Sequence, residues 1–293
     1  NGVTPAAYRE LRTARAFELA LPAGYPAGYL KQALGRDTQS LTERLDGDTY
    51  TTVIRLGPDR TPSLLILHLS PHRIRVEIDA CHAPEAHAFA VALLGLDQDA
   101  AAFARLARKL GLARLVAGRP GLRLPQTPSF FDGLLWSIIG QQINLPFAFQ
   151  LRRRLIEHTS RPFADGLHAP PTSADIAALS PDDLRPLQFS RSKAVYLIET
   201  ARLVASGRLD LDALRTMSAT RAERTLLAVR GLGPWSVNYL MMRSLGFADV
   251  APVGGSTMVT VLDGAGDENG ETNASYNMRA GNSYRIPASA LHA

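Results

Sequence analysis

The segment from residue 226 to residue 239, Leu-Leu-Ala-Val-Arg-Gly-Leu-Gly-Pro-Trp-Ser-Val-Asn-Tyr, has the residue types and spacing of an anion-binding turn. An apolar helical pattern leads into Gly231, Leu232 and Gly233, and Pro234 is typical of the first position of a new helix. Such a turn leaves backbone amides free at a helix N-terminus, where hydrogen bonding and the helix dipole both favour an anion. We therefore expect a helix-hairpin-helix that binds phosphate, although an ordinary turn between two helices has the same pattern.

Trp235 and Tyr239 add an aromatic element to the second helix of this hairpin. Their spacing places both rings on one face of that helix, next to the phosphate-binding turn. Two such rings can stack against a nucleic-acid base that has been rotated out of a duplex. The alternative is that both rings belong to the hydrophobic core, which is the common role of an aromatic pair at helical spacing.

The composition fits a globular protein that can bind a polyanion. The chain has 293 residues, 46% of them hydrophobic, and a formal net charge of +5. No apolar run is long enough to cross a membrane, and the first residues lack the pattern of a secretory leader. Cys81 is the only cysteine, which excludes a disulfide within the chain and a metal site built from several cysteines. We expect a cytoplasmic monomer that does not bind membranes.

The first part of the chain, residues 14–83, predicts a small antiparallel sheet with one helix on it. Alternating or β-branched-rich patterns predict the strands, and a Ser-Pro-His-Arg turn separates the last two. The helix is expected between residues 28 and 44. The strands are expected at residues 17–21, 49–56, 64–69 and 74–78.

Residues 84–262 change to a helical pattern, which predicts a larger all-helical domain that contains the hairpin. The whole chain is therefore expected to be α+β, a small antiparallel sheet domain followed by a helical one. Thr220 and Glu223 predict a capping box at the start of the helix that enters the hairpin, and Ser180 and Asp183 have the same spacing. Further helices are expected at residues 85–94, 100–110, 130–141, 148–158, 173–179, 193–205 and 222–229.

Four motifs in sequence order resemble those of the 3-methyladenine DNA glycosylase II family, within the helix-hairpin-helix glycosylase superfamily. The first is residues 87–97, a helix that leads into a Leu-Gly-Leu-Asp step, and the second is residues 130–143, which contain Ile-Ile-Gly-Gln-Gln. The hairpin with Trp235 is the third, and residues 249–254 with a Pro-Val-Gly step are the fourth. The resemblance extends over residues 17–262.

The resemblance implies hydrolysis of the N-glycosidic bond of an alkylated purine in double-stranded DNA, after the damaged nucleotide has turned out of the duplex. It implies a base pocket with Trp235 and Tyr239, to which we add Trp136, and a wedge at Gln142, beside Gln141, that fills the gap in the duplex. We expect no cofactor and no metal site, apart from a monovalent cation that the hairpin carbonyls can hold. The DNA-binding turn would consist of Gly231, Leu232, Gly233 and Ser236.

The same resemblance separates this chain from two other branches of the superfamily. Branches with a lyase step carry a lysine at the position of Trp235, which forms a Schiff base, and this hairpin has no lysine. A branch with an iron–sulfur cluster needs four cysteines near its C-terminus, and only Cys81 is present. The resemblance therefore implies a monofunctional glycosylase.

One position departs from the family pattern. The family's catalytic aspartate, which stabilises the developing positive charge on the sugar or orients water, falls at Gly255. Glycine supplies no carboxylate, and nothing in the spacing of Asp249, Asp263 or Asp267 makes one of them a replacement. We therefore expect impaired excision with DNA binding retained. The alternative is a non-catalytic module that binds damaged or distorted duplex DNA, which would need the hairpin and the wedge but no carboxylate.

The two ends of the chain differ from the region of resemblance. Residues 263–293 hold four asparagines, against three in everything before them, and show no helical period. We expect an irregular tail there, because such a segment buries too little apolar surface to fold by itself. Residues 1–13 resemble the end of an AraC-type helix-turn-helix domain, which implies that the parent protein is a fusion of an adaptive-response regulator with a glycosylase.

Overall fold

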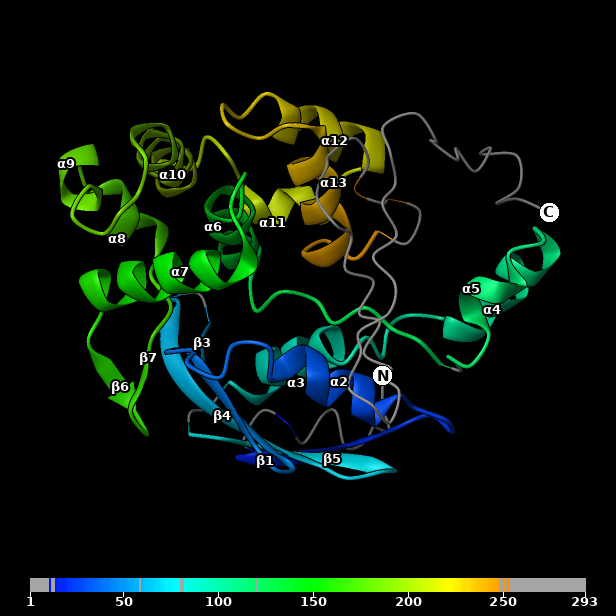
Figure 1. Cartoon of the computed structure of the whole chain (residues 1–293). Coiled ribbons are helices and arrows are strands. Elements are labelled where there is room, and N and C mark those ends of the chain that lie inside the picture. The colour runs from blue at the N-terminus through cyan, green and yellow to red at the C-terminus, as the bar shows by residue number, and fades with distance from the viewer. Residues whose placement is uncertain are drawn as a thin grey trace.

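The computed structural model describes residues 11, 14–57, 59–79, 82–119, 121–247, 250 and 252. A twisted sheet lies along the lower edge of the view in Figure 1, with a body of helices above it. The α+β fold class expected from the sequence is confirmed. Within the described residues, no helix combines the length and the apolar character needed to cross a membrane.

The sheet has five antiparallel strands in the order β1-β5-β4-β3-β2. Buried and less buried residues alternate along β4, so one face of the sheet is directed into a core. Two helices, α2 (Ala27–Leu34) and α3 (Ala83–Leu93), contribute buried side chains to that core. The strands are β1 (Ala16–Ala20), β2 (Glu43–Asp46), β3 (Thr49–Leu56), β4 (Thr61–Leu69) and β5 (Arg73–Ile78).

The helix expected over residues 28–44 is wrong in its second half. Helix α2 ends at Leu34, and the chain then returns as strand β2, which pairs with β3 in a hairpin. Gly47, with φ 57°, supplies the left-handed position in the hairpin turn. Strand β2 is short and polar, so its pairing with β3 determines its conformation more than its own sequence pattern does.

The helical body has its own hydrophobic core, which contains fully buried residues of α6, α10, α12 and α13. Helix α3 packs with the sheet, although residue 84 was the expected start of the helical domain. The helices after α3 are α4 (Ala100–Lys109), α5 (Ala113–Val116), α6 (Phe130–Ile139), α7 (Leu145–Thr159), α8 (Ser173–Ala177), α9 (Pro181–Leu184), α10 (Arg191–Ala205), α11 (Leu211–Leu214), α12 (Ala219–Leu227) and α13 (Pro234–Arg243).

One of the two expected capping boxes is present at the start of its helix, and the other is not. The box of Ser180 and Asp183 is confirmed at α9. The box expected at Thr220 is wrong, because α12 begins at Ala219, directly after Ser218, and no side chain caps it. A two-stranded hairpin, β6 (Pro162–Ala164) with β7 (Leu167–His168), was not expected and packs beside β3.

A buried ionic network joins the sheet to the helical body. Arg152 of α7 donates to the Asp132 carboxylate of α6 at 3.1 Å and lies 3.9 Å from Glu43 of β2. Tyr50 of β3 donates to the same Glu43 at 2.7 Å. Burial raises the pKa of Glu43, although Arg152 opposes this. Burial lowers the pKa of Arg152, but the neighbouring carboxylates outweigh that effect and raise it above its ordinary value.

Candidate functional site

The turn between α12 and α13 requires a glycine at its centre. Gly231 has φ 91°, and a Cβ atom at this position would lie 2.5 Å from the Tyr196 ring of α10. Gly233 precedes α13 as its N-cap, is exposed, and would meet nothing within 4 Å if it carried a Cβ. The turn is therefore pressed against α10 on one side and open to solvent on the other.

The side chains of the turn point inward and leave the backbone to face solvent. Leu232 is buried in the helical core, and Ser236 in the first turn of α13 is buried as well. No described residue accepts a hydrogen bond from the amides of Gly231 or Gly233, and no side chain caps α13. Of the four DNA-binding residues predicted here, Leu232 and Ser236 can therefore contribute only backbone groups.

Gln141, which follows α6, ties the hairpin to the rest of the body. Its side-chain Nε2 donates to the Gly231 carbonyl at 2.8 Å and lies 3.4 Å from the Ser236 hydroxyl. Lys193 of α10 donates from Nζ to the Ile139 carbonyl at 2.6 Å, at the end of α6. These bonds hold the end of α6, the start of α10 and the hairpin together.

Gln142 is exposed and has a left-handed backbone, with φ 56°. A non-glycine residue in this region carries strain, which often accompanies a functional role. Its neighbour Gln141 fixes it close to the hairpin, and Asn144 caps the following helix α7. The structure thus places the predicted wedge on the surface beside the predicted phosphate-binding turn.

Trp235 and Tyr239 stack on each other, with ring centroids 5.5 Å apart and planes at 11°. Burial raises the pKa of Tyr239. The Trp235 Nε1 atom is buried without a hydrogen-bond partner among the described residues. Trp136, predicted in the same pocket, instead stacks on Phe149 of α7, with ring centroids 5.2 Å apart. Among the described ring contacts, none is between Trp136 and Trp235 or Tyr239.

Two arginines beside this stack were not singled out from the sequence. Arg243, the last residue of α13, has its guanidinium carbon 6.0 Å from the centre of the Tyr239 ring. Arg36, just after α2, is close enough to affect the pKa of Tyr239 and of Tyr29. The spacing of Arg243 four residues after Tyr239 was a signal for the first arginine, whereas only the fold brings Arg36 to the same place.

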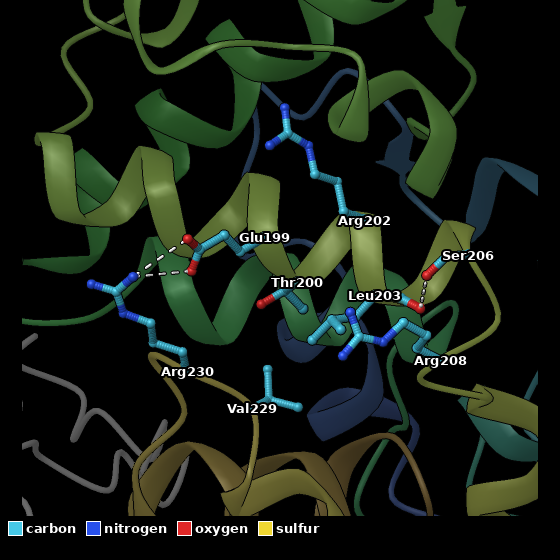
Figure 2. Close-up of a pocket in the computed structure, with 8 residues that line it drawn as sticks. All are labelled: Glu199, Thr200, Arg202, Leu203, Ser206, Arg208, Val229 and Arg230. Atoms are coloured by element: carbon cyan, nitrogen blue, oxygen red, sulfur yellow. Dashed lines mark hydrogen bonds and ion pairs between the residues drawn. The ribbon is translucent and has the colours of Figure 1, made fainter.

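A hollow of about 480 Å³ lies between α10 and the end of α12 (Figure 2). Its inner surface is mostly apolar, with Leu203 and Val229, and the Thr200 hydroxyl there has no hydrogen-bond partner among the described residues. Arg230 at its rim pairs with Glu199 at 3.4 Å and lies over the Tyr196 ring. None of the predicted base-pocket residues lines this hollow.

The position expected for the catalytic carboxylate, Gly255, lies outside the described residues, as does Asp249. Val250, between the two, packs against the helical core. An AraC-type end was expected for residues 1–13 and an irregular tail for residues 263–293; apart from residue 11, these also lie outside the described residues. Within the part of the chain that the structure describes, no group of three or more histidine, cysteine or acidic residues is placed to hold a metal ion.

One family model covers the part of the chain that contains the hairpin. Residues 135–270 match the family model of the HhH-GPD superfamily base excision DNA repair protein. The DNA-3-methyladenine glycosylase of Bacillus subtilis is 36% identical over 166 residues, 54% of each chain. DNA-3-methyladenine glycosylase 2 of Escherichia coli is 30% identical over 141 residues, 47% of this chain and 49% of that protein. The chain thus spans about half the length of the curated relatives it matches.

A solved structure extends the similarity of fold beyond the hairpin. The 3-methyladenine DNA-glycosylase from Archaeoglobus fulgidus aligns with a TM-score of 0.69 at 21% identity, over 80% of this chain and 81% of that one. At this identity the likeness concerns the fold alone. The HhH-GPD match and the relatives named DNA-3-methyladenine glycosylase both support the 3-methyladenine glycosylase family within the HhH-GPD superfamily.

Proposed function

We propose that this chain binds duplex DNA through the hairpin and receives an alkylated purine, turned out of the duplex, beside Trp235 and Tyr239. The observation that carries the proposal is the placement of the free amides of Gly231 and Gly233 next to the Trp235–Tyr239 stack. Amides at a helix N-terminus bind a phosphate group, and neighbouring rings stack against a base. The relatives named DNA-3-methyladenine glycosylase support an alkylated purine as the target.

The reaction that follows is hydrolysis of the N-glycosidic bond. The exposed Gln142 side chain is placed to occupy the gap that the turned-out nucleotide leaves in the base stack. A Schiff base with the sugar would need a free amine at the pocket. The hairpin has no lysine, and the nearby Lys193 is occupied by the Ile139 carbonyl. Water is therefore the nucleophile in this proposal.

Excision by this chain is proposed to be impaired. The resemblance puts the family's carboxylate at Gly255, and a carboxylate stabilises the positive charge that develops on the sugar as the bond breaks. A glycine cannot replace that interaction, so the rate is expected to fall by orders of magnitude. The glycine at position 255 also favours a second candidate function, a non-catalytic module that binds distorted duplex DNA. Such a module needs no carboxylate at this position.

Excision of 3-methyladenine from methylated duplex DNA distinguishes the two candidates. The chain is compared with its Gly255→Asp and Gly255→Asn variants, of which the second has nearly the same size but no charge. Release of base by the aspartate variant alone would support an intact pocket that lacks its carboxylate. Release at equal rates by all three would contradict the proposed impairment.

A binding measurement completes this test. Affinity is measured for a duplex that contains a tetrahydrofuran abasic-site analogue and for the matched undamaged duplex. If no variant releases base but all three bind the abasic duplex more tightly, the non-catalytic candidate gains. If none binds either duplex, the proposal as a whole is wrong.

A monovalent cation at the hairpin carbonyls is part of the proposal. The Val229 carbonyl accepts from the Leu232 amide and the Gly231 carbonyl from Gln141, so each oxygen keeps one lone pair for a cation. A cation there would add positive charge next to the bound phosphate. DNA affinity that stays the same when tetramethylammonium replaces potassium at constant ionic strength would contradict it.

A further inference from the structure

The predicted wedge, Gln142, lies in a short segment between helices α6 and α7. Its side chain is exposed and its backbone is left-handed, with φ 56°. A residue other than glycine is strained in this conformation, which persists only where neighbouring contacts hold the backbone. On the C-terminal side Asn144 makes such a contact, because its side chain accepts from the Phe147 amide at 2.9 Å and caps α7. The matching contact on the N-terminal side must come from the end of α6.

Lys193 of α10 supplies that contact. Its Nζ donates to the carbonyl of Ile139, the last residue of α6, at 2.6 Å. Carbonyls in the last turn of a helix lack partners within the helix, and the helix dipole favours a cation there. No backbone amide of the described residues donates to the Ile139 carbonyl. Lys193 is half-buried, and burial lowers its pKa. Its ammonium group is therefore directed into the protein, onto the helix end that precedes the wedge.

Helix α10 makes a second contact one turn later, with the hairpin. Tyr196 follows Lys193 by three residues, so the two side chains share a face of α10. The Tyr196 ring lies against Gly231, where a Cβ atom would be only 2.5 Å away. Gln141, the residue before the wedge, donates to the Gly231 carbonyl at 2.8 Å. One face of α10 thus holds both the end of α6 and the hairpin, and Gln141 connects the two directly.

We propose that Lys193 is a positioning residue, which fixes the Gln142 wedge relative to the phosphate-binding turn by holding the Ile139 carbonyl. The proposal rests on the proposed function, because it takes Gln142 as the wedge. A wedge that is already ordered in the free protein loses less entropy when it enters the base stack. Lys193 should therefore contribute to the preference for a duplex with a gap, and little to the affinity for intact DNA.

The test compares Lys193→Met, which keeps the stem but removes the ammonium group, with Lys193→Arg, which keeps a cation that can donate. Affinity is measured for an abasic-site duplex and for the matched intact duplex, over a range of salt concentrations. Lys193→Met should lose roughly tenfold of the preference for the abasic duplex, the value of one charge-assisted hydrogen bond. Lys193→Arg should recover most of it. The slope of log affinity against log salt should stay nearly the same, because no phosphate contact is lost.

Lys109→Met is the matched control, because it makes the same chemical change elsewhere. Lys109 is exposed at the end of α4, which lies at the edge of the molecule in Figure 1. This variant should keep the full preference for the abasic duplex. All affinities are measured at a temperature at which circular dichroism shows every variant to be folded. A lysine with a purely structural role would then change the melting temperature and leave the preference unaltered.

A measurement without DNA tests the same contact independently. The amides of Gly140 and Gln141 donate to carbonyls of α6, and their hydrogen exchange reports opening of that helix end. Lys193→Met should speed this exchange about tenfold and leave the α4 amides unchanged. If the unmodified protein binds no duplex, the proposed function fails, and the exchange rates alone decide whether Lys193 holds this segment. Equal rates in both proteins would show that it does not.

Three results with DNA would overturn the positioning role. One is a preference for the abasic duplex that is the same in Lys193→Met and the unmodified protein. Another is an equal loss on both duplexes with a salt slope lower by about 1, which would make Lys193 a direct phosphate contact. The third is a loss in Lys193→Arg as large as in Lys193→Met, because a cation on the Ile139 carbonyl would then not be what matters.

Discussion

The chain contains two helix–turn–helix units whose turns have similar local sequences but different surroundings. In α12–α13 the turn glycine, Gly231, sits against Tyr196, and Leu232 is buried in the helical core. In α4–α5 the turn glycine, Gly111, has φ 74° and nothing near it, and Leu112 beside it is 42% exposed. Figure 1 shows α4 and α5 at the edge of the molecule, away from the other helices. A local pattern therefore predicts the turn, but packing decides whether the turn becomes a rigid site.

The largest difference is expected when each turn glycine is replaced by alanine. Gly231→Ala adds a Cβ 2.5 Å from the Tyr196 ring at a left-handed position, and should lower the free energy of unfolding by roughly 3 kcal/mol. Gly111→Ala adds only the left-handed strain, about 1 kcal/mol. Urea unfolding measures both. Equal losses would mean that the Tyr196 contact does not constrain the hairpin.

Hydrogen exchange should show the same contrast without a mutation. Helix α4 buries only two alanines and leaves Phe103 52% exposed, so it can open locally while the rest stays folded. Helix α13 buries Val237, Leu240 and Met241 in the helical core. Protection of α4 amides is expected to be about a hundredfold lower than that of α13 amides, a difference of about 2.7 kcal/mol in opening free energy. Similar protection of the two helices would mean that a binding partner stabilises α4 against local opening.

The two units also show how much of the fold could be predicted from the sequence. The glycines and Pro234 are local features from which the hairpin was predicted, and the β-branched pattern at residues 49–56 predicted strand β3 in the same way. Strand β2 was missed because it is defined by its pairing with β3. The electrostatic effect of Arg36 on Tyr239 was missed for the same reason, since the two residues are far apart in sequence and only the fold brings them near each other.

A smaller contrast concerns one hydrogen-bonding side chain at each unit. Gln141 donates to the Gly231 carbonyl at 2.8 Å, and Asp99 caps α4 by accepting from the Ala102 amide at 2.8 Å. Gln141→Leu and Asp99→Ala should each lower the free energy of unfolding by about 1 kcal/mol. Only Gln141→Leu should weaken binding to abasic-site duplex, because only that bond positions the proposed phosphate-binding turn. Fluorescence anisotropy with labelled duplex tests this, and equal affinity in both variants would contradict it.

The smallest effect on stability is expected at Gln142, where function and folding can be separated. Its φ of 56° is unfavourable for glutamine and natural for glycine, so Gln142→Gly relieves local strain. The flexible glycine also raises the entropy of the unfolded chain, and the two effects should nearly cancel. Gln142→Ala keeps the strained backbone and should leave stability at or below that of the unmodified protein. Both variants lose the exposed side chain, so both should lose the same part of their preference for abasic over intact duplex. If alanine and glycine weaken that preference by different amounts, the backbone conformation at Gln142 contributes to DNA recognition along with the wedge side chain.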